Sequence, residues 1–225
     1  MSIDNNAKWP AIFELLNPSE LEKINTNKLQ INFKAGEIIR KQGAPLTHVI
    51  VFNSGLAKLY IEGKSKSNII IRLITPKHII AGPGIYYDLR HHYSIKAISD
   101  SDTFFISALL IKEIISKNKK FGFAFNRELS KNTLITYERL VNLIQKQMPG
   151  RMADLLIYLS QEIYHSRVFK NILSRSDMSE MAGMSKDNIN RILREFEQRG
   201  LIRYNDKIDL LNIPSLQSIC EKGHY

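Results

Sequence analysis

The sequence predicts an α+β fold with an N-terminal β-barrel of jelly-roll type, one long helix and a small C-terminal domain built mainly from helices. Three observations support this prediction. Short runs rich in β-branched and aromatic residues, separated by turn residues, fill residues 29–107. A helical pattern then runs from 120 to 147 with Gly122 as its only glycine and no proline. Amphipathic segments and two short strands follow, and 225 residues suffice for two domains.

The barrel is predicted from seven β-rich runs. Two short helices precede it, WPAIFELL and PSELEKIN, each with a proline near its first turn, where the missing N–H costs nothing. Glycines separate the early runs at intervals of 7 to 12 residues, at Gly36, Gly43, Gly55 and Gly63, which is typical of a β-sandwich or barrel. We assign residues 1–119 to this domain. The runs are LQINF, EIIRK, HVIVF, LAKLYIE, NIIIRLI, YSIKAI and DTFFIS.

The long helix, which follows a short helix at LLIKEIISKN, carries two apolar stripes at heptad-like spacing. Two stripes need two partners. We expect one to pack on the barrel and the other to meet the same helix of a second subunit, so that the chain forms a homodimer. The alternative is a helix buried in a single core, because heptad matches over three turns are a weak pattern. The dimer contacts are assigned to Leu129, Thr133, Thr136, Leu140 and Leu143, and the other stripe comprises Leu134, Tyr137, Val141, Ile144 and Met148.

A break is predicted at Met148-Pro149-Gly150. The residue before a proline disfavours the helical conformation, and glycine adds freedom. We place a hinge and the domain boundary here, which leaves a long dimerisation helix over 120–147 and a C-terminal domain over 148–225. The amphipathic segment RMADLLIYLSQEIY predicts the first helix of that domain.

The segment LSRSDMSEMAGMSKDNINRILREFEQRGLIRY predicts two helices joined by a tight turn. Ser174 and Asp177 have the spacing of a capping box, with Asp in place of Glu or Gln. Gly183 is placed to adopt the left-handed conformation that ends the first helix, and Ser185 is a good N-cap for the second. The pattern is therefore that of a helix-turn-helix.

The second helix of this motif has one apolar and one polar face. Its charged N-terminal half has the geometry needed to enter the major groove of DNA. Arginine can donate two hydrogen bonds to guanine, and aspartate can accept one from cytosine. A helical hairpin with a solvated charged face is the alternative. The apolar face comprises Ile189, Ile192, Leu193 and Phe196, and we assign base contacts to Lys186, Asp187, Asn190 and Arg191.

Two short strands around Asn205-Asp206, in GLIRYNDKIDLLNIP, predict a β-wing that lies along DNA phosphates. The net charge of +10 suits a polyanionic partner. However, residues 147–225 hold 11 basic and 10 acidic residues, against 21 and 12 in residues 1–146, so bulk charge does not locate the nucleic-acid site. We assign phosphate contacts to Ser174, Ser185, Arg194, Arg203 and Lys207.

The segment SRSDMSEMAGMSKDNINRILREFEQRGLI resembles the winged helix-turn-helix of Crp/Fnr transcription regulators. FKAGEIIRKQG and HVIVFNSGLAKLY are similar to the opening strands of that family's cyclic-nucleotide-type jelly roll, and the order of parts matches over nearly the whole chain. The resemblance implies a homodimeric regulator, not an enzyme, that binds double-stranded DNA at a pseudo-palindromic operator, with RNA polymerase as a further partner. By position, it marks Lys186, Asp187 and Arg191 as base-contacting residues.

The expected effector pocket departs from that of the cyclic-AMP-binding members. They carry a Gly-Glu pair and, about ten residues later, an Arg-Ser or Arg-Thr that binds the cyclic phosphate. The corresponding stretch, HIIAGPGIYYDLRHHYSIKA, has no Glu, and alignment on YSIKA puts His91 and His92 at the Arg-Ser positions. Cyclic AMP is therefore doubtful and the effector unknown. An anionic or aromatic ligand, a metal and a plain polar surface turn remain open. The pocket candidates are Gly82, Arg90, His91 and His92.

The sequence also limits cofactors. Cys220 is the only cysteine, which excludes an intrachain disulfide and a cysteine-ligated iron–sulfur cluster. No motif supports haem bound through His78 or His91, so we expect none. Neighbours in a strand point to opposite faces, so His91 and His92 would rarely share a metal, and we predict no metal site. The barrel also lacks the H-x-H pattern of a cupin-like enzyme.

Two further expectations concern compartment and function. No apolar run is long enough to span a bilayer and no signal-peptide pattern opens the chain, so we expect a cytoplasmic protein without membrane contact. An effector-sensing or protein-interaction module without DNA binding is the alternative function. The near-neutral C-terminal domain is the observation that favours it.

Overall fold

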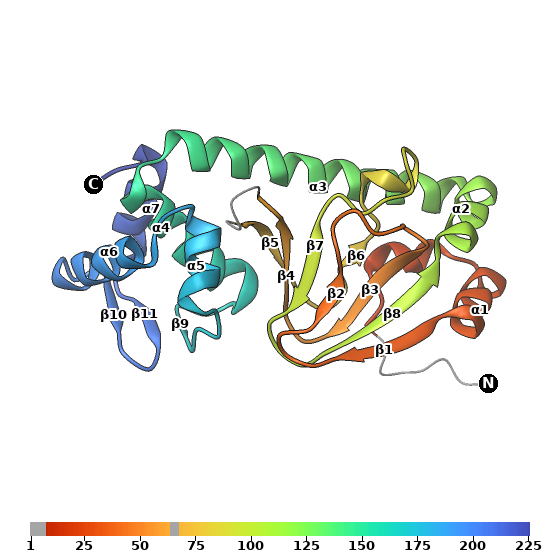
Figure 1. Cartoon of the computed structure of the whole chain (residues 1–225), viewed down its shortest axis with the longest axis horizontal. Helices are drawn as coiled ribbons and strands as arrows, with labels where there is room; N and C mark the ends of the chain where they lie inside the picture. The colour runs from red at the N-terminus through yellow and green to blue at the C-terminus, as the bar shows by residue number, and fades with distance from the viewer. Residues whose placement is uncertain (1–7, 64–67) are drawn as a thin grey trace. The chain divides into compact units, whose positions relative to one another are not determined.

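The computed structural model describes residues 8–63 and 68–225, and the chain divides into two compact units. The first comprises the described residues up to Glu62 and those from Arg72 to Ile135. The second comprises the described residues from Gly63 to Ile71 and those from Thr136 to Tyr225. One continuous helix, α3 (Lys119–Gln145), contributes residues to both units (Figure 1).

The first unit contains the predicted jelly roll as two four-stranded sheets. Their strand orders are β1-β8-β3-β6 and β2-β7-β4-β5. Strands far apart in the sequence pair antiparallel, β1 with β8 and β2 with β7, so the last strands of the domain lie beside the first. The strands are β1 (Leu29–Phe33), β2 (Ile38–Arg40), β3 (His48–Ser54), β4 (Ala57–Ile61), β5 (Ile69–Ile74), β6 (Ile79–Ile80), β7 (Ser94–Ala97) and β8 (Ser101–Ser107).

All seven predicted β-rich runs contain a strand of the barrel. The prediction missed only β6, because two residues are too few to show an alternating pattern. Both predicted N-terminal helices are present, as the 3₁₀ helix η1 (Ala11–Leu15) and as α1 (Pro18–Asn27). In α1 the proline lies in the first turn, behind a capping box between Asn17 and Glu20.

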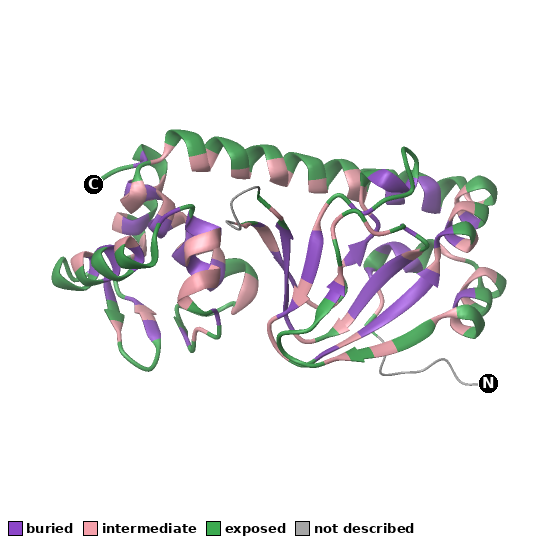
Figure 2. Cartoon of the chain, viewed as in Figure 1, coloured by how far each residue is buried: buried purple, intermediate pink, exposed green. Residues whose placement is uncertain are grey.

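One core joins the barrel to the helices around it. Phe121 and Phe125, in the first turns of α3, are almost fully buried, as is Phe13 of η1, which meets Phe121 edge to face at 5.8 Å. Burial of each such ring contributes about 2 to 3 kcal/mol. The start of α3 is therefore fixed to the barrel, together with α2 (Ala108–Lys117). Figure 2 shows the purple, buried start of this helix and the mostly exposed remainder.

The predicted position of the helix break is corrected by the structure. α3 ends at Gln145, and Met148-Pro149-Gly150 does not interrupt a helix but opens the next one, α4 (Met148–Tyr158). In the first turn of a helix a backbone N–H has no intrahelical acceptor, so proline, which lacks this N–H, is tolerated there and can begin a helix. The break lies at Lys146 and Gln147, where the Gln147 N–H donates to the Gly223 carbonyl at 2.8 Å.

The second unit packs helices against a small sheet of order β10-β11-β9. The predicted helix after the break is α4, continued by one π-helical segment. The final helix and β9 were not predicted, although an asparagine N-cap, an early proline and a glycine C-cap all mark the final helix. No helix among residues 8–63 and 68–225 has the length and apolar character to cross a membrane. The remaining elements are η3 (Leu159–Ile163), β9 (Val168–Phe169), α5 (Arg175–Ala182), α6 (Lys186–Gln198), β10 (Ile202–Tyr204), β11 (Ile208–Leu210) and α7 (Ile213–Lys222).

Candidate nucleic-acid interface and effector pocket

α5 and α6 form the predicted helix-turn-helix. The Ser174 side chain accepts from the Asp177 N–H while Asp177 accepts from the Ser174 N–H, which completes the capping box. Gly183 ends α5 at φ 58° and ψ 42°, the left-handed conformation that glycine tolerates best. Ser185 caps α6 by accepting from the Asn188 N–H at 3.2 Å. The turn is held further by Arg151, which donates to the Gly183 carbonyl at 3.0 Å.

α6 buries one face and exposes the other. The predicted apolar residues of α6 are all at most 2% exposed, and α6 lies beside α5, which buries Met178 and Met181. The exposed face forms a shallow hollow that holds three of the four predicted base-contacting residues. Lys186, the fourth, is exposed in the first turn of the helix. The hollow is lined by Asp187, Asn190, Arg191, Arg194, Glu195 and Gln198.

Arg191 has a partner on its own helix. Its Nη1 donates to Glu195 Oε1 one turn later, in a close ion pair. The other oxygen of this carboxylate, Oε2, accepts from the Tyr225 hydroxyl at 2.5 Å. These contacts, with the Tyr225 hydrogen bond the largest cause, lower the pKa of Glu195. Glu195 and Tyr225 were not predicted as site residues, although the i,i+4 spacing of Arg191 and Glu195 is a recognised helix pair.

The wing is present as β10 and β11, which pair from Ile202–Leu210 to Tyr204–Ile208. It is tied to the helices through Tyr204. The Tyr204 N–H donates to Glu197 of α6 at 3.0 Å, and its ring lies 4.8 Å from the Arg175 guanidinium of α5. Arg203 and Lys207 project from this anchored hairpin, and both are exposed.

The other predicted phosphate-contacting residues lie at helix ends or on the outer face of α6. Ser174, Ser185 and Arg194 are all exposed. The Ser174 hydroxyl already donates to Asp177 at 2.6 Å, whereas the Ser185 oxygen accepts from Asn188 and donates to no group that the structure describes. Ser185 therefore keeps its O–H for an outside acceptor, next to the positive end of the α6 dipole.

The segment predicted to hold an effector lies between β6 and β7. Gly82 has a φ of 72°, and a side chain there would collide with the Tyr93 hydroxyl, 2.7 Å from the Cβ position. Arg90 is exposed and donates to the Gly43 carbonyl at 2.9 Å, so its guanidinium fastens two loops. Both residues shape the segment.

His91 and His92 lie before β7 and not, as the sequence had suggested, in a strand, and the first is buried while the second is exposed. His92 is exposed and pairs with Asp88 at 3.1 Å. His91 is 1% exposed, and neither ring nitrogen has a hydrogen-bond partner among residues 8–63 and 68–225. Burial, aided by the nearby positive charges of Arg40 and His92, lowers the pKa of His91 to about 4. The described residues contain no group of three or more His, Cys, Asp or Glu side chains that could hold a metal.

Arg40, the last residue of β2, lies close enough to His91 to lower its pKa, and it was not predicted as a site residue. Its guanidinium is 4.5 Å from the centre of the Phe105 ring, and burial lowers its pKa. The His48 ring meets Phe105 edge to face, with ring centres 6.0 Å apart, and the pKa of His48 is lowered by burial and by Arg40. Among the described residues no carboxylate forms an ion pair with Arg40, and burial is the only cause of its lowered pKa.

The residues predicted for the dimer helix fall into three environments. Leu129 packs against the barrel core, and Leu143 contacts Gly183, since a Cβ there would be 2.8 Å from its Cδ2. Thr133 and Leu140 are exposed, and Thr136 is half-buried. Two members of the predicted stripe, Leu129 and Leu143, therefore take part in the chain's own packing, whereas Leu140 stays 55% exposed.

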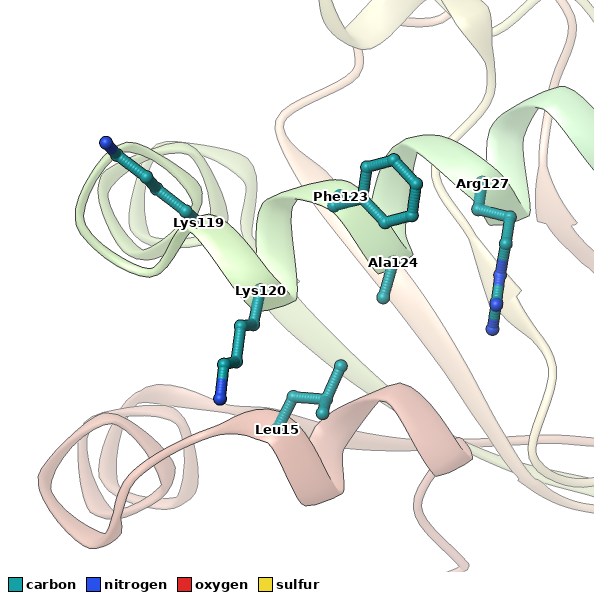
Figure 3. A pocket seen from close by; sticks show the side chains of 6 residues that line it. All are labelled: Leu15, Lys119, Lys120, Phe123, Ala124 and Arg127. Atoms are coloured by element: carbon teal, nitrogen blue, oxygen red, sulfur yellow. The ribbon is translucent and has the colours of Figure 1, made fainter.

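The second stripe, called the outward stripe, is the more exposed of the two along α3, and its predicted last member, Met148, is half-buried at the start of α4. Leu134, Tyr137, Val141 and Ile144 are 46 to 73% exposed and follow each other at alternating spacings of three and four residues. The same spacing extends back through Ser130 and Arg127 to Phe123, which is 73% exposed. Figure 3 shows this end of the stripe, where a groove lies between Leu15 of η1 and the first turns of α3, lined also by Lys119, Lys120 and Ala124.

Two family models match the chain. The cyclic nucleotide-binding domain matches residues 30–118, and the Crp-like helix-turn-helix domain matches residues 150–219. The chain is similar to the transcriptional regulatory protein Btr of Bordetella pertussis, with 24% identity over 207 residues that cover 89% of this chain and 85% of that protein. It is also similar to the CRP-like cAMP-activated global transcriptional regulator of Mycobacterium tuberculosis, with 21% identity over 89% of this chain and 92% of that protein.

Solved structures agree on the fold. The chain resembles FixK2 from Bradyrhizobium japonicum with a TM-score of 0.78 at 15% identity, over 85% of this chain and 96% of that one. A Crp/Fnr regulator from Eubacterium rectale gives 0.77 at 20% identity, over 94% and 98%. With a jelly roll, a long helix and a capped, winged helix-turn-helix in one chain, and with both family models matched, this protein belongs to the Crp/Fnr family of DNA-binding transcription regulators.

Proposed function

We propose that this regulator acts as a homodimer that reads a two-fold symmetric DNA site, with α6 of each subunit in the major groove. The observation that carries the proposal is the exposed face of α6, on which Asp187, Asn190 and Arg191 surround one hollow while the opposite face is buried. Two such helices related by a two-fold axis read half-sites about one helical turn apart, roughly 10 base pairs.

The contacts divide by position. Lys186, Asp187, Asn190 and Arg191 occupy the first half of α6, which faces base edges when a recognition helix enters the groove. Ser185 at the helix start and the wing cations contact phosphates, because they lie at the edges of this surface and are exposed. The proposed phosphate contacts are Ser174, Ser185, Arg194, Arg203 and Lys207.

The proposed dimer seam is the outward stripe of α3 rather than the stripe chosen from the sequence. A continuous row of apolar side chains at coiled-coil spacing is costly to leave in water, and a second copy of the same helix covers it most simply. Residues 1–119 then act as the sensor domain, 120–147 as the dimerisation helix and 148–225 as the DNA-binding domain.

A small-molecule input enters through the barrel, whose family model is that of a cyclic nucleotide-binding domain. The half-buried Arg40, without a carboxylate partner among the described residues, favours an anionic ligand near His48 and His91. Cyclic AMP is not proposed, because His91 and His92 occupy the positions of the Arg-Ser pair when the chain is aligned on YSIKA, and the stretch HIIAGPGIYYDLRHHYSIKA contains no Glu. Promoter DNA and RNA polymerase are the expected partners, in the cytoplasm.

Arg191→Ala tests the base-reading assignment. Duplexes enriched from a random library by the full chain supply the preferred site. If Arg191 donates two hydrogen bonds to a guanine, the variant should lose about 1 to 3 kcal/mol and relax its preference at one position in each half-site. Arg203→Ala is the matched control, which should weaken all sequences about equally and lower the salt slope by about 1.

An equal loss for preferred and scrambled duplexes with Arg191→Ala would make Arg191 a backbone contact. The base-reading role would then pass to Lys186, Asp187 or Asn190. Failure of the full chain to enrich any sequence would contradict the proposed site reading as a whole.

A further inference from the structure

Tyr225 connects the segment after α7 to the recognition helix α6. Its hydroxyl donates to Glu195 Oε2 at 2.5 Å, and its ring meets the buried Phe196 ring edge to face at 6.0 Å. The Arg199 guanidinium covers the ring at 3.7 Å. Three side chains from about one turn at the C-terminal end of α6, Glu195, Phe196 and Arg199, therefore hold a single tyrosine.

The chain is bent to bring Tyr225 to this place. Gly223 ends α7 at φ 80°, a left-handed conformation that turns the chain back toward α6. The Gly223 carbonyl accepts from the Gln147 N–H at 2.8 Å, and Gly150 packs so closely on Gly223 that a side chain there would lie 2.5 Å from it. The ring of Tyr225 thus approaches Glu195 from a fixed turn.

Glu195 passes this restraint on to Arg191. One carboxylate oxygen is held by Tyr225 and the other by Arg191 Nη1, so the carboxylate lies between the two side chains. An arginine has five N–H donors, and one contact with Glu195 leaves enough of them for a bidentate bond to a base. A long side chain that is already oriented loses less conformational freedom when it binds.

We propose that Tyr225 is a positioning residue for DNA reading, which orients Glu195 and, through it, the Arg191 guanidinium toward the base that Arg191 reads. The inference rests on the base-reading role proposed for Arg191. It adds a determinant of specificity that lies outside the helix-turn-helix and does not itself touch DNA. The ring of Tyr225 packs in place, and only its O–H acts on Glu195.

Tyr225→Phe in the full chain tests this proposal, because it keeps the ring contacts with Phe196 and Arg199 and removes the hydroxyl. Binding constants are measured on the preferred duplex, on one substituted at the base pair that Arg191→Ala relaxes, and on a scrambled duplex at fixed salt. Tyr225→Phe should lower discrimination at that base pair about threefold to tenfold, which corresponds to freeing one long side chain. Affinity for scrambled DNA should stay unchanged, and Tyr225→Phe added to Arg191→Ala should have no further effect.

Tyr164→Phe is the matched control. It removes another tyrosine hydroxyl of the same unit, one that accepts from the Ile172 N–H and does not touch α6. It should leave discrimination as in the unmodified chain, and thermal unfolding of each variant establishes that it is folded.

Unchanged discrimination by Tyr225→Phe, with relaxation by Arg191→Ala, would overturn this inference alone. The inference would also be overturned if Tyr225→Phe lowered discrimination by the same factor in the unmodified chain and in the Arg191→Ala variant. Unchanged discrimination by Arg191→Ala would overturn both the inference and the base-reading assignment.

Discussion

Acid should destabilise this protein through His91. The imidazole is 1% exposed and has no hydrogen-bond partner in the described part of the chain, and its pKa is lowered from 6.5 to about 4 by burial, Arg40 and His92. In the unfolded chain the pKa of His91 returns to its ordinary value, so between pH 6.5 and about 4 the unfolded chain binds a proton at His91 while the folded chain does not. Stability is thus lost as the pH falls from 6.5 towards 4. A pKa change of this size corresponds to about 3 kcal/mol at the acid end of that window.

Urea unfolding at pH 7, 5.5 and 4.5 measures this effect. His91→Leu removes the titrating group and leaves an apolar side chain of similar size, so the free energy of unfolding should depend on pH less than in the unmodified chain, by about 2 to 3 kcal/mol over this range. His92→Leu is the control, since His92 is exposed and its removal should leave the loss in acid largely intact. If the unmodified chain and His91→Leu lost the same free energy between pH 7 and 4.5, the burial argument would be refuted.

Three further outcomes are expected. The double variant Tyr137→Glu and Ile144→Glu should be monomeric in light scattering, because it places like charges at the proposed seam. The control double variant, Thr133→Glu and Lys131→Glu, should remain dimeric. A dimer of unchanged affinity in the first variant would mean that the outward stripe of α3 is not the seam. Gly183→Ala should lower the free energy of unfolding by about 1 to 2 kcal/mol in urea melts, because alanine is strained in the left-handed conformation and its Cβ crowds Leu143. Gly200→Ala is the control: Gly200 has a φ of 66° with open space around it, so this variant should lose only the free energy due to backbone strain. Equal losses in the two variants would exclude a contribution from crowding. Cyclic AMP should not raise the melting temperature, and micromolar binding by calorimetry would contradict that expectation.

The helix-turn-helix was predictable because the residues that build it are neighbours in the chain. A capping box needs only Ser174 and Asp177 three residues apart, and the turn needs only a residue such as Gly183 that tolerates a left-handed conformation. The exposed face of α6 follows from helical periodicity in the same way. Strand runs of five or more residues were equally readable, whereas the two-residue strand β6 was not.

The choice between the two stripes of α3 could not be made from the sequence. Both have apolar residues at similar spacing, and which one faces the chain's own core depends on how the helix leaves Phe121 and Phe125 in the barrel. In the structure Leu129 packs partly buried against the barrel core, whereas Tyr137 and Ile144 are exposed, and this difference favours the outward stripe as the seam.

The sequence by itself determined the order of the domains, the caps and turn of the DNA-binding motif and the absence of the cyclic-AMP signature, because each depends on residues close together in the chain. The burial of His91 near Arg40 follows from the packing of the barrel, because β3 to β6 separate these two residues in the chain. Only the tertiary structure brought Tyr225 to Glu195, thirty residues away. Such contacts depend on how separate elements pack, and no local pattern encodes the position of one element against another.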